Sequence, residues 1–211
     1  MLINVDIWVM KKMFSSEITL ENERVRLKPL LDLDIDILLS FVKSEPNLWQ
    51  YSTIPPNTPE RMKSYLSKAI SDRSIGDSYT FLVYDKLKDS YAGCTRFYDY
   101  QDNHDTCQLG YTWIGKQYQG TGLNKNCKYL MLEFAFERMK LQRVEFRADA
   151  NNARSIAAMK SIGCTVEGIL RQNYKKLDGR RDSIILSILA DEWHDSIKEN
   201  LRTKINSERI G

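Results

Sequence analysis

One stretch of the chain, residues 106–138, changes its hydrophobic period from two to about 3.6 within a few residues. The run 106–114 is rich in aromatic and β-branched side chains, which is typical of a strand. Gly120 and Gly122 follow, and beyond them apolar side chains recur at spacings of three and four: Leu123, Cys127, Leu130, Met131, Phe134 and Ala135. That spacing places them on one face of a helix that we expect to reach about Arg138. The stretch therefore predicts a strand, a glycine loop and a long helix in succession.

The loop Gln117-Tyr118-Gln119-Gly120-Thr121-Gly122 has the features of an anion site. The start of a helix presents unpaired backbone N–H groups and the positive end of its dipole, and glycine lets a ligand approach the backbone closely. The P-loop pattern is absent, and Lys125 stands where a dinucleotide fingerprint requires glycine. The pattern that remains is Gln/Arg-x-x-Gly-x-Gly/Ala, met by Gln117, Gly120 and Gly122.

Strand and helix signals alternate along the rest of the chain. Strands are expected at about 24–29, 79–85, 91–98, 106–114, 143–150, 164–170 and 183–189, and helices at about 32–43, 58–72, 123–138, 152–162 and from 191 onward. Thr58 followed by Pro59 is a helix-start signal, and Asp178-Gly179 is a hairpin signal between the last two strands. The order predicts an α/β fold built on a mixed sheet.

The length of 211 residues, 42% of them hydrophobic, suits one domain that buries its core without metals or disulfides. We expect this domain to span residues 18–204. Residues 1–17 would be an N-terminal extension whose ordering the sequence leaves open, and residues 205–211 a C-terminal tail. No repeat, linker or low-complexity segment interrupts the domain.

Charge and cysteine usage exclude several classes of partner. The net charge is +3 from 31 basic and 28 acidic residues, without a basic run interleaved with aromatics, so nucleic acid is not expected as a partner. No apolar run approaches the ~20 residues of a membrane span. The cysteines lie far apart, and the chain has only two histidines to complete a metal site, so no metal site is expected. The sequence predicts instead buried or half-buried reduced thiols at Cys94, Cys107, Cys127 and Cys164. A cytoplasmic location fits this usage.

Several motifs after the loop occur in the order and spacing of a known family. They are Asn152-Ala153-Arg154-Ser155, Ala157-x-Met159-Lys160-x-x-Gly163, Glu167-Gly168-x-Leu170-Arg171, Asp178-Gly179-x-x-Asp182 and Glu192-Trp193. With the loop, they make the chain resemble the GNAT superfamily, in particular its RimJ/RimL type, over about Leu20 to Leu201. The resemblance implies a central sheet of about seven strands, mostly antiparallel, with splayed strands 4 and 5 and flanking helices. It also implies an N-acetyltransferase that uses acetyl-CoA.

The same resemblance assigns residues to the cofactor. The strand before the loop would hold the pantetheine arm near Trp113, and the amide of Ile114 or a neighbour would face the thioester oxygen. The loop and helix start would bind the pyrophosphate, and Asn152 would bind the pantetheine arm. The complete set of cofactor residues implied in this way is Trp113, Ile114, Gln117, Gln119, Gly120, Thr121, Gly122, Leu123, Asn124, Asn152 and Ser155.

Two residues are catalytic candidates by the same resemblance. The Ser155 hydroxyl could protonate the leaving thiolate, or it could satisfy a free N–H at the start of a helix. Tyr174 stands where related enzymes carry an acidic residue that holds a water, and tyrosine is a poor base at neutral pH but a competent acid. Tyr174 would therefore protonate the thiolate or line the amine pocket.

The acceptor side is the less defined half of the predicted site. Trp49, Tyr98 and Tyr100 occupy the region that walls the acceptor in this family, although ordinary core packing explains these aromatics equally well. The acceptor would be a primary amine, either a peptide or ribosomal-protein N-terminus or a small molecule, attacking acetyl-CoA directly in a ternary complex. The alternative function is an acyl-CoA-binding sensor with little or no catalysis. Both a monomer and a homodimer are compatible with the sequence.

Overall fold

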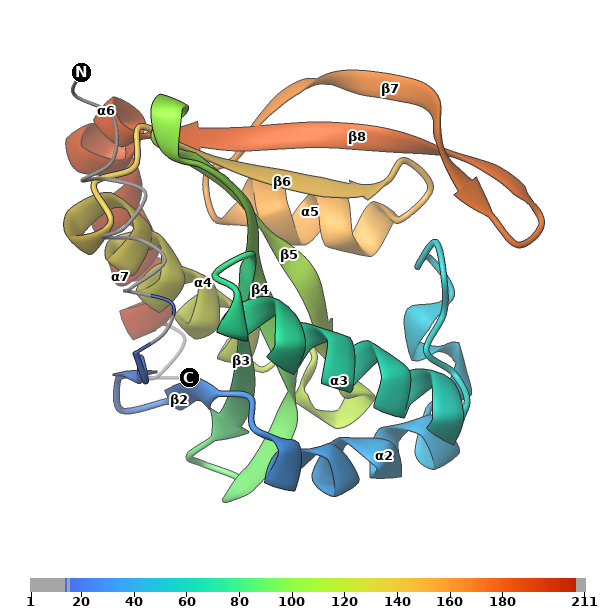
Figure 1. Ribbon diagram of the computed structural model, residues 1–211. Helices are drawn as coiled ribbons and strands as arrows, with labels where there is room; N and C mark the ends of the chain where they lie inside the picture. The colour runs from blue at the N-terminus through green and yellow to red at the C-terminus, as the bar shows by residue number, and fades with distance from the viewer. Residues whose placement is uncertain (1–13, 15, 208–211) are drawn as a thin grey trace, which may run out of the picture.

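The computed structural model describes residues 14 and 16–207, in which eight strands form one sheet in the order β1-β2-β3-β4-β5-β6-β8-β7 (Figure 1). The strands are β1 (Leu20–Glu21), β2 (Val25–Pro29), β3 (Ser78–Asp85), β4 (Ser90–Gln101), β5 (Thr106–Ile114), β6 (Arg143–Asp149), β7 (Thr165–Lys176) and β8 (Gly179–Leu189). All neighbouring strands are antiparallel except β5 and β6, which are parallel. The α/β fold with a mostly antiparallel sheet is thereby confirmed.

Helices cover both faces of this sheet (Figure 1). They are α2 (Ile35–Ser44), α3 (Pro59–Ser74), α4 (Leu123–Glu133), α5 (Ala153–Ser161), α6 (Ala190–Glu192) and α7 (Lys198–Ser207). Short 3-10 turns lie at η1 (Asp32–Asp34), η2 (Pro46–Trp49), η3 (Asp102–His104) and η4 (Lys116–Tyr118), and π-turns at η5 (Phe134–Arg138) and η6 (Trp193–Ile197). Side chains of α3 and α4 contact neighbouring residues of β4 that point to opposite faces, so these two helices sandwich the centre of the sheet.

The predicted helix starts are formed by local hydrogen bonds. Thr58 caps α3, because its side chain accepts a hydrogen bond from the amide of Arg61 at 3.3 Å and Pro59 occupies the first turn. Asn152 caps α5 in the same way, accepting from the amide of Ser155 at 3.1 Å. The helix predicted from the apolar stripe also holds, since α4 continues through η5 to Arg138.

The sheet divides where β5 leaves β6. These two strands pair only through Thr106↔Arg143, Cys107↔Val144 and Gln108↔Glu145. Beyond Gln108, β5 stays with β4 while β6 stays with β8, and the two arms diverge in Figure 1. This is the splay that the family resemblance implied, between the strands numbered β5 and β6 here.

A bulge lies in β5 within the diverged arm. Cys94 is opposite Trp113 and Arg96 is opposite Gly110, so β5 has one residue more than β4 between these pairs. Tyr111, in the bulge, has a φ of 48°, in the left-handed region. Gly93 permits the close approach at this point, because a Cβ there would lie 2.0 Å from the carbonyl oxygen of Trp113.

The strand count differs slightly from the expected seven. The additional strand, β1, has only two residues and is too short to show any period. The final hairpin is longer than predicted: Lys176 pairs with Gly179 at the expected Asp178-Gly179 turn, and β7 continues far past residue 170. Its second half was missed because β7 is an edge strand with most of its side chains exposed, so no apolar alternation marks it.

The ends of the described chain pack against the core. Phe14, inside the segment assigned to the extension, is buried and its ring lies 5.5 Å from that of Tyr79. At the other end α7 reaches Ser207, and Ile205 is buried. The remainder of the expected extension and tail, residues 1–13, 15 and 208–211, lies outside the described residues.

The four cysteines are free and buried, as the sequence predicted. In the described part of the chain no three His, Cys, Asp or Glu side chains are grouped so as to hold a metal ion. Within the same residues no helix combines the length and the apolar character that crossing a bilayer requires.

Candidate active site

The outer edge of β5 provides backbone donors to the gap between the two arms of the sheet. The amide of Gly115 donates to the carbonyl of Ala92 on the β4 side at 2.9 Å. Antiparallel pairs alternate in direction, so Ile114 points its N–H and C=O away from β4, toward the side that β6 has left. The carbonyl of Ile114 accepts a hydrogen bond from the Gln119 side chain at 2.6 Å. The Ile114 N–H therefore faces the gap.

The loop after β5 ends in a cradle of backbone amides. Gly120 and Gly122 have φ of 74° and 77°, and Gly122 is the N-cap of α4. In the described structure the N–H groups of residues 120–124 have no acceptor. A Cβ on Gly120 would meet nothing within 4 Å, and Oδ1 of Asn124 is buried without a partner. Open space beside unpaired donors at a helix N-terminus fits a diphosphate.

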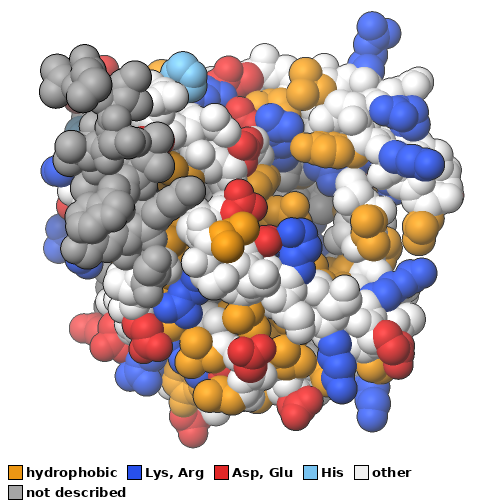
Figure 2. All heavy atoms as spheres, viewed as in Figure 1, with side chains coloured by type: hydrophobic (Ala, Val, Ile, Leu, Met, Phe, Trp, Pro, Cys, Tyr) orange, Lys and Arg blue, Asp and Glu red, His pale blue; other side chains and the backbone are white. Residues whose placement is uncertain are grey.

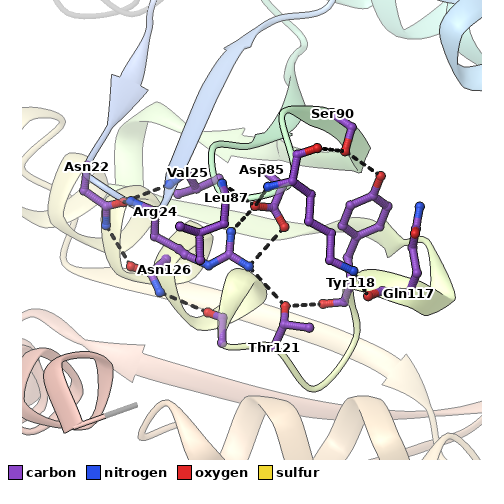
Figure 3. Close-up of polar contacts among 12 residues, drawn as sticks. Asn22, Arg24, Val25, Asp85, Leu87, Ser90, Gln117, Tyr118, Thr121 and Asn126 are labelled. Atoms are coloured by element: carbon purple, nitrogen blue, oxygen red, sulfur yellow. Dashed lines mark hydrogen bonds and ion pairs between the residues drawn. The ribbon is translucent and has the colours of Figure 1, made fainter. Parts of the chain in front are cut away.

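A buried ion pair supports this loop from behind (Figure 3). Arg24, which immediately precedes β2, binds both carboxylate oxygens of Asp85 on β3, one of them at 3.0 Å. Nη2 of Arg24 also donates to Oγ1 of Thr121 at 3.3 Å, and that hydroxyl donates to the carbonyl of Tyr118 at 2.7 Å. The hydrophobic pattern gave no sign of this pair, because the partners lie 61 residues apart.

Side chains on either side of the ion pair hold the two ends of the loop. Nδ2 of Asn126 donates to the carbonyl of Gly122 at 3.0 Å, and Asn22 donates to Oδ1 of Asn126 at 2.9 Å. At the other end, Nζ of Lys88 donates to the carbonyl of Gln117 at 2.7 Å (Figure 3). The cradle is thus fixed by residues of the sheet and of α4 before any ligand arrives.

Gln117 itself points away from the gap between the arms. Its side chain is exposed and lines a hollow of about 760 Å³ shared with Phe41 and Glu45 of the α2 region and with Tyr118. Of the loop residues expected to bind the cofactor, Gln117 is the one placed toward α2.

The start of α5 lies across the gap from the loop. Arg154 donates a hydrogen bond to Oε1 of Gln119, which joins the two arms directly. Oδ1 of Asn152 is occupied by the Ser155 amide, so its Nδ2 is the group left for a ligand. The Ser155 hydroxyl is half-buried and makes no hydrogen bond to the described residues. The structure therefore gathers Ile114, the loop, Asn152 and Ser155 around one gap.

A buried lysine lies beneath the β5 bulge on the α4 side. Lys128 is 5% exposed, and its Nζ donates to Oγ1 of Thr95 at 3.0 Å and to Oγ1 of Thr112 at 2.7 Å. Burial lowers the pKa of Lys128 to about 7. The pattern of the helix did not single it out, since a lysine beside an apolar stripe ordinarily extends into solvent.

The structure places the three predicted acceptor residues in three different surroundings. Trp49 is 4% exposed and packs edge-on against Trp113, with ring centroids 5.2 Å apart, so both indoles belong to the core. The hydroxyl of Tyr100 donates to Asp102 at 2.9 Å in the turn at the far end of β4. Tyr98, in contrast, lies among the polar groups of the opposite arm.

Tyr98 and Tyr174 belong to a cluster of tyrosines and arginines that joins the arms. Burial raises the pKa of Tyr98, while Arg147 acts to lower it and Tyr174 to raise it. The Arg147 guanidinium donates to the hydroxyl of Tyr174 at 3.3 Å, and Arg181 lies over the Tyr174 ring at 5.6 Å. The structure thus brings Tyr98 and Tyr174 into one neighbourhood, with arginines that the sequence did not single out.

Comparison with known proteins is consistent across sequence and structure. A family model described as an acetyltransferase (GNAT) domain matches residues 24–165. An uncharacterized N-acetyltransferase p20 of Bacillus licheniformis is 27% identical over 177 residues, covering 83% of this chain and 98% of that protein.

Solved structures with the same fold include a GCN5-related N-acetyltransferase from Brucella melitensis. Its TM-score is 0.82 at 23% identity, covering 90% of this chain and 86% of that one. A Mycobacterium smegmatis RimJ in complex with CoA-disulfide has a TM-score of 0.76 at 18% identity, covering 89% and 93% of the two chains.

Proposed function

The chain belongs to the GNAT acetyltransferase family, and from that premise we propose that it moves the acetyl group of acetyl-CoA to a primary amine by direct attack in a ternary complex. The row of unpaired amides at residues 120–124, open to the gap between the sheet arms, is the observation that carries this proposal. Acetyl-CoA would supply the activated thioester and a diphosphate. The resemblance of the fold to a RimJ solved with CoA-disulfide supports the same ligand.

The residues of the loop would bind and orient the diphosphate. Amides of Gly120 to Asn124 would approach it at the positive end of the α4 dipole, and glycine at 120 and 122 keeps the approach free of side chains. Arg24 acts indirectly, through Thr121, by keeping these donors in place. Because the cradle is held before binding, little ordering free energy is lost when the ligand arrives.

The Ile114 N–H would act on the reacting carbonyl. It faces the gap, and a donor so placed stabilises the negative charge that develops on the thioester oxygen during acyl transfer. Nδ2 of Asn152 would donate to the pantetheine arm from the other side of the gap.

Two hydroxyls are available to protonate the leaving thiolate. Ser155 presents one from the first turn of α5, and Tyr174 presents one that is held by Arg147. The incoming amine must lose a proton before it attacks, and the nearby carboxylates of Glu145 and Asp149 are already engaged by cations. We infer that water carries this proton to solvent.

Substitution of Gly120 tests the cofactor site with a matched control. Gly120→Ala should weaken CoA binding by at least about tenfold, measured by calorimetry, because the new methyl group enters the open space where the diphosphate docks. Gly179→Ala, in the β7–β8 turn, also strains a positive-φ glycine with open space around it and should leave CoA affinity unchanged. Equal affinity in Gly120→Ala and the unsubstituted protein would mean that the diphosphate binds elsewhere.

A sensor that binds acetyl-CoA without efficient catalysis is the second candidate. Tyr174 favours it, because this residue, with Arg147 at its hydroxyl and Arg181 over its ring, stands where related enzymes carry a carboxylate. Thiol release from acetyl-CoA in the presence of amines and N-terminal peptides distinguishes the two functions. Tight CoA binding without release above background would support the sensor.

A further inference from the structure

Arg96 of β4 is a buried cation without a counter-ion. It is 5% exposed, and its Nε and Nη2 are fully enclosed without any hydrogen-bond partner. No carboxylate of the described residues forms an ion pair with it. Its guanidinium lies over the ring of Tyr65 at 5.2 Å and over the ring of Tyr111 at 4.5 Å. The guanidinium is therefore held between two aromatic rings, a clamp in which Nε and Nη2 donate no hydrogen bond.

The backbone is shaped to build this clamp. Tyr111 adopts a φ of 48° in the β5 bulge, a conformation that is uncommon for a residue with a side chain, and in this position its ring reaches Arg96. Tyr65 comes from α3, on the face of β4 opposite Lys128. Strained backbone clusters at active sites and ligand clamps, and a buried polar group without a partner calls for an explanation, of which a bound ion or ligand is one.

The side chains next to this clamp form a wall that is also basic. Tyr111 packs edge-on against Tyr98 at 4.8 Å, and Tyr98 leads to Arg147 and Tyr174 on the other arm. Arg181, half-buried there, has one hydrogen bond, from Nε to Oγ of Ser183 at 3.0 Å, and no carboxylate partner among the described residues.

These side chains lie between the two arms of the sheet, because Tyr98 and Tyr111 come from β4 and β5 and Arg147, Tyr174 and Arg181 come from β6, β7 and β8. Figure 2 shows a depression to the right of centre, between the positions of α3 and the β7–β8 hairpin in Figure 1, with basic, acidic and hydrophobic side chains around it. A cationic acceptor such as a polyamine would meet repulsion from Arg96 and Arg181, which have no carboxylate partner among the described residues.

We propose, on the basis of the proposed acetyl transfer, that the acceptor amine carries an anionic group, a carboxylate or a phosphate, which Arg96 binds between Tyr65 and Tyr111. Nε and Nη2 lie on one edge of the planar guanidinium and have no partner, so an oxyanion that reaches them between the two rings would accept two parallel hydrogen bonds. Arg96 is opposite Gly110, four residues from Ile114, so at ~3.3 Å per residue the anion and the reacting centre lie on the order of 10 Å apart along β5. The acceptor therefore has a spacer between its amine and its anion.

Matched pairs of acceptors test this assignment. Each pair is an ω-amino carboxylate of six to ten carbons, a range whose extended length includes ~10 Å, and its primary amide. Aminoalkyl phosphates and a diamine are further arms, and kcat/KM is measured by thiol release. The protein should prefer the anionic member of at least one pair by tenfold or more. Arg96→Gln should remove the preference by slowing the anionic member alone, and Arg96→Lys should retain part of it. Preference for phosphates over carboxylates would identify which anion is used.

A control arginine and a binding measurement separate this proposal from the function on which it rests. Arg138→Gln removes another guanidinium from an aromatic ring, that of Phe134, at an exposed position, and should leave the preference unchanged. Calorimetry of the protein–CoA complex with N-acetylated products should show the carboxylate binding at least tenfold more tightly than the amide, and this difference should vanish in Arg96→Gln.

The outcomes distinguish the two ideas. Equal kcat/KM and equal product affinity for the charged and neutral members would overturn the role of Arg96 while CoA binding and acetylation still stood. A preference for the anionic acceptors that persists in Arg96→Gln would also overturn the role of Arg96. Absent CoA binding would instead remove the proposed acetyl transfer.

Discussion

Replacement of Lys128 by methionine should stabilise the protein near neutral pH, by an amount that shrinks as the pH rises. The ammonium group is buried between Thr95 and Thr112, and desolvation lowers its pKa from 10.5 to about 7. Lys128→Met keeps the length and apolar stem of the side chain and removes the buried charge. The two threonine hydroxyls stay paired with each other at 2.8 Å, so neither is left unsatisfied.

The magnitude follows from the linkage between protonation and folding. Between pH 7 and 10 the unfolded chain carries the Lys128 proton and the folded chain does not, so the stability of the unsubstituted protein rises with pH by up to ~1.4 kcal/mol per unit. Below pH 7 both states are protonated, and the full penalty is present. A shift from 10.5 to about 7 makes this penalty ~5 kcal/mol, and two lost hydrogen bonds of ~1 kcal/mol each offset part of it. Lys128→Met should therefore be ~2–4 kcal/mol more stable at pH 6.5 and ~1–2 kcal/mol less stable at pH 10, where the charge penalty has almost vanished and the two lost hydrogen bonds remain.

Urea unfolding followed by tryptophan fluorescence at pH 6.5, 8 and 9.5 measures this difference. The control is Lys63→Met on α3, where the side chain is exposed and the change should stay within about 0.5 kcal/mol at every pH. A stability difference between Lys128→Met and the unsubstituted protein that does not vary with pH would refute the reasoning, since it would mean that Lys128 keeps its proton in the folded state over this range.

Two further substitutions test the support of the loop and the acid of the reaction. Asp85→Asn should lower the free energy of unfolding by ~3–5 kcal/mol, because it leaves Arg24 buried without its partner, and it should weaken CoA binding because Thr121 is released. The control Glu21→Gln breaks an exposed pair with Arg26 and should change neither the free energy of unfolding nor the CoA affinity. A CoA affinity unaffected by Asp85→Asn would show that the loop does not need this support. Tyr174→Phe should lower kcat by about 100-fold without changing CoA affinity, in steady-state assays and calorimetry, because a positioned proton donor acts on the chemical step alone. A fully active Tyr174→Phe would leave Ser155 as the remaining candidate acid.

Local signals in the chain were enough to predict most residues of the proposed cofactor site. Gly120 and Gly122 can be recognised because only glycine enters the left-handed region freely, and both do so here. Asn152 could be placed at a helix start because capping depends on neighbours three residues away. These features were predictable since each is decided within a few residues of sequence.

The acceptor half depended on pairings that no local pattern reports. Trp49 and Tyr100 are aromatics of the same kind as Tyr98, yet one packs into the core on Trp113, one turns to Asp102, and only Tyr98 faces the opposite arm. Which of them reaches the site is decided by the register of β4 with β5 and by the bulge at Tyr111.

The sequence by itself determined the order of the elements, the glycine loop at the start of α4 and the cap of α5, because backbone conformation and hydrophobic period act over short distances. Only the tertiary structure decided that β5 separates from β6, that Lys128 is buried, and that Arg96 lies between Tyr65 and Tyr111. A charged side chain looks the same in the sequence whether it meets solvent, a counter-ion or two aromatic rings. Packing between segments far apart in the chain sets that environment, and with it the chemistry of the acceptor side.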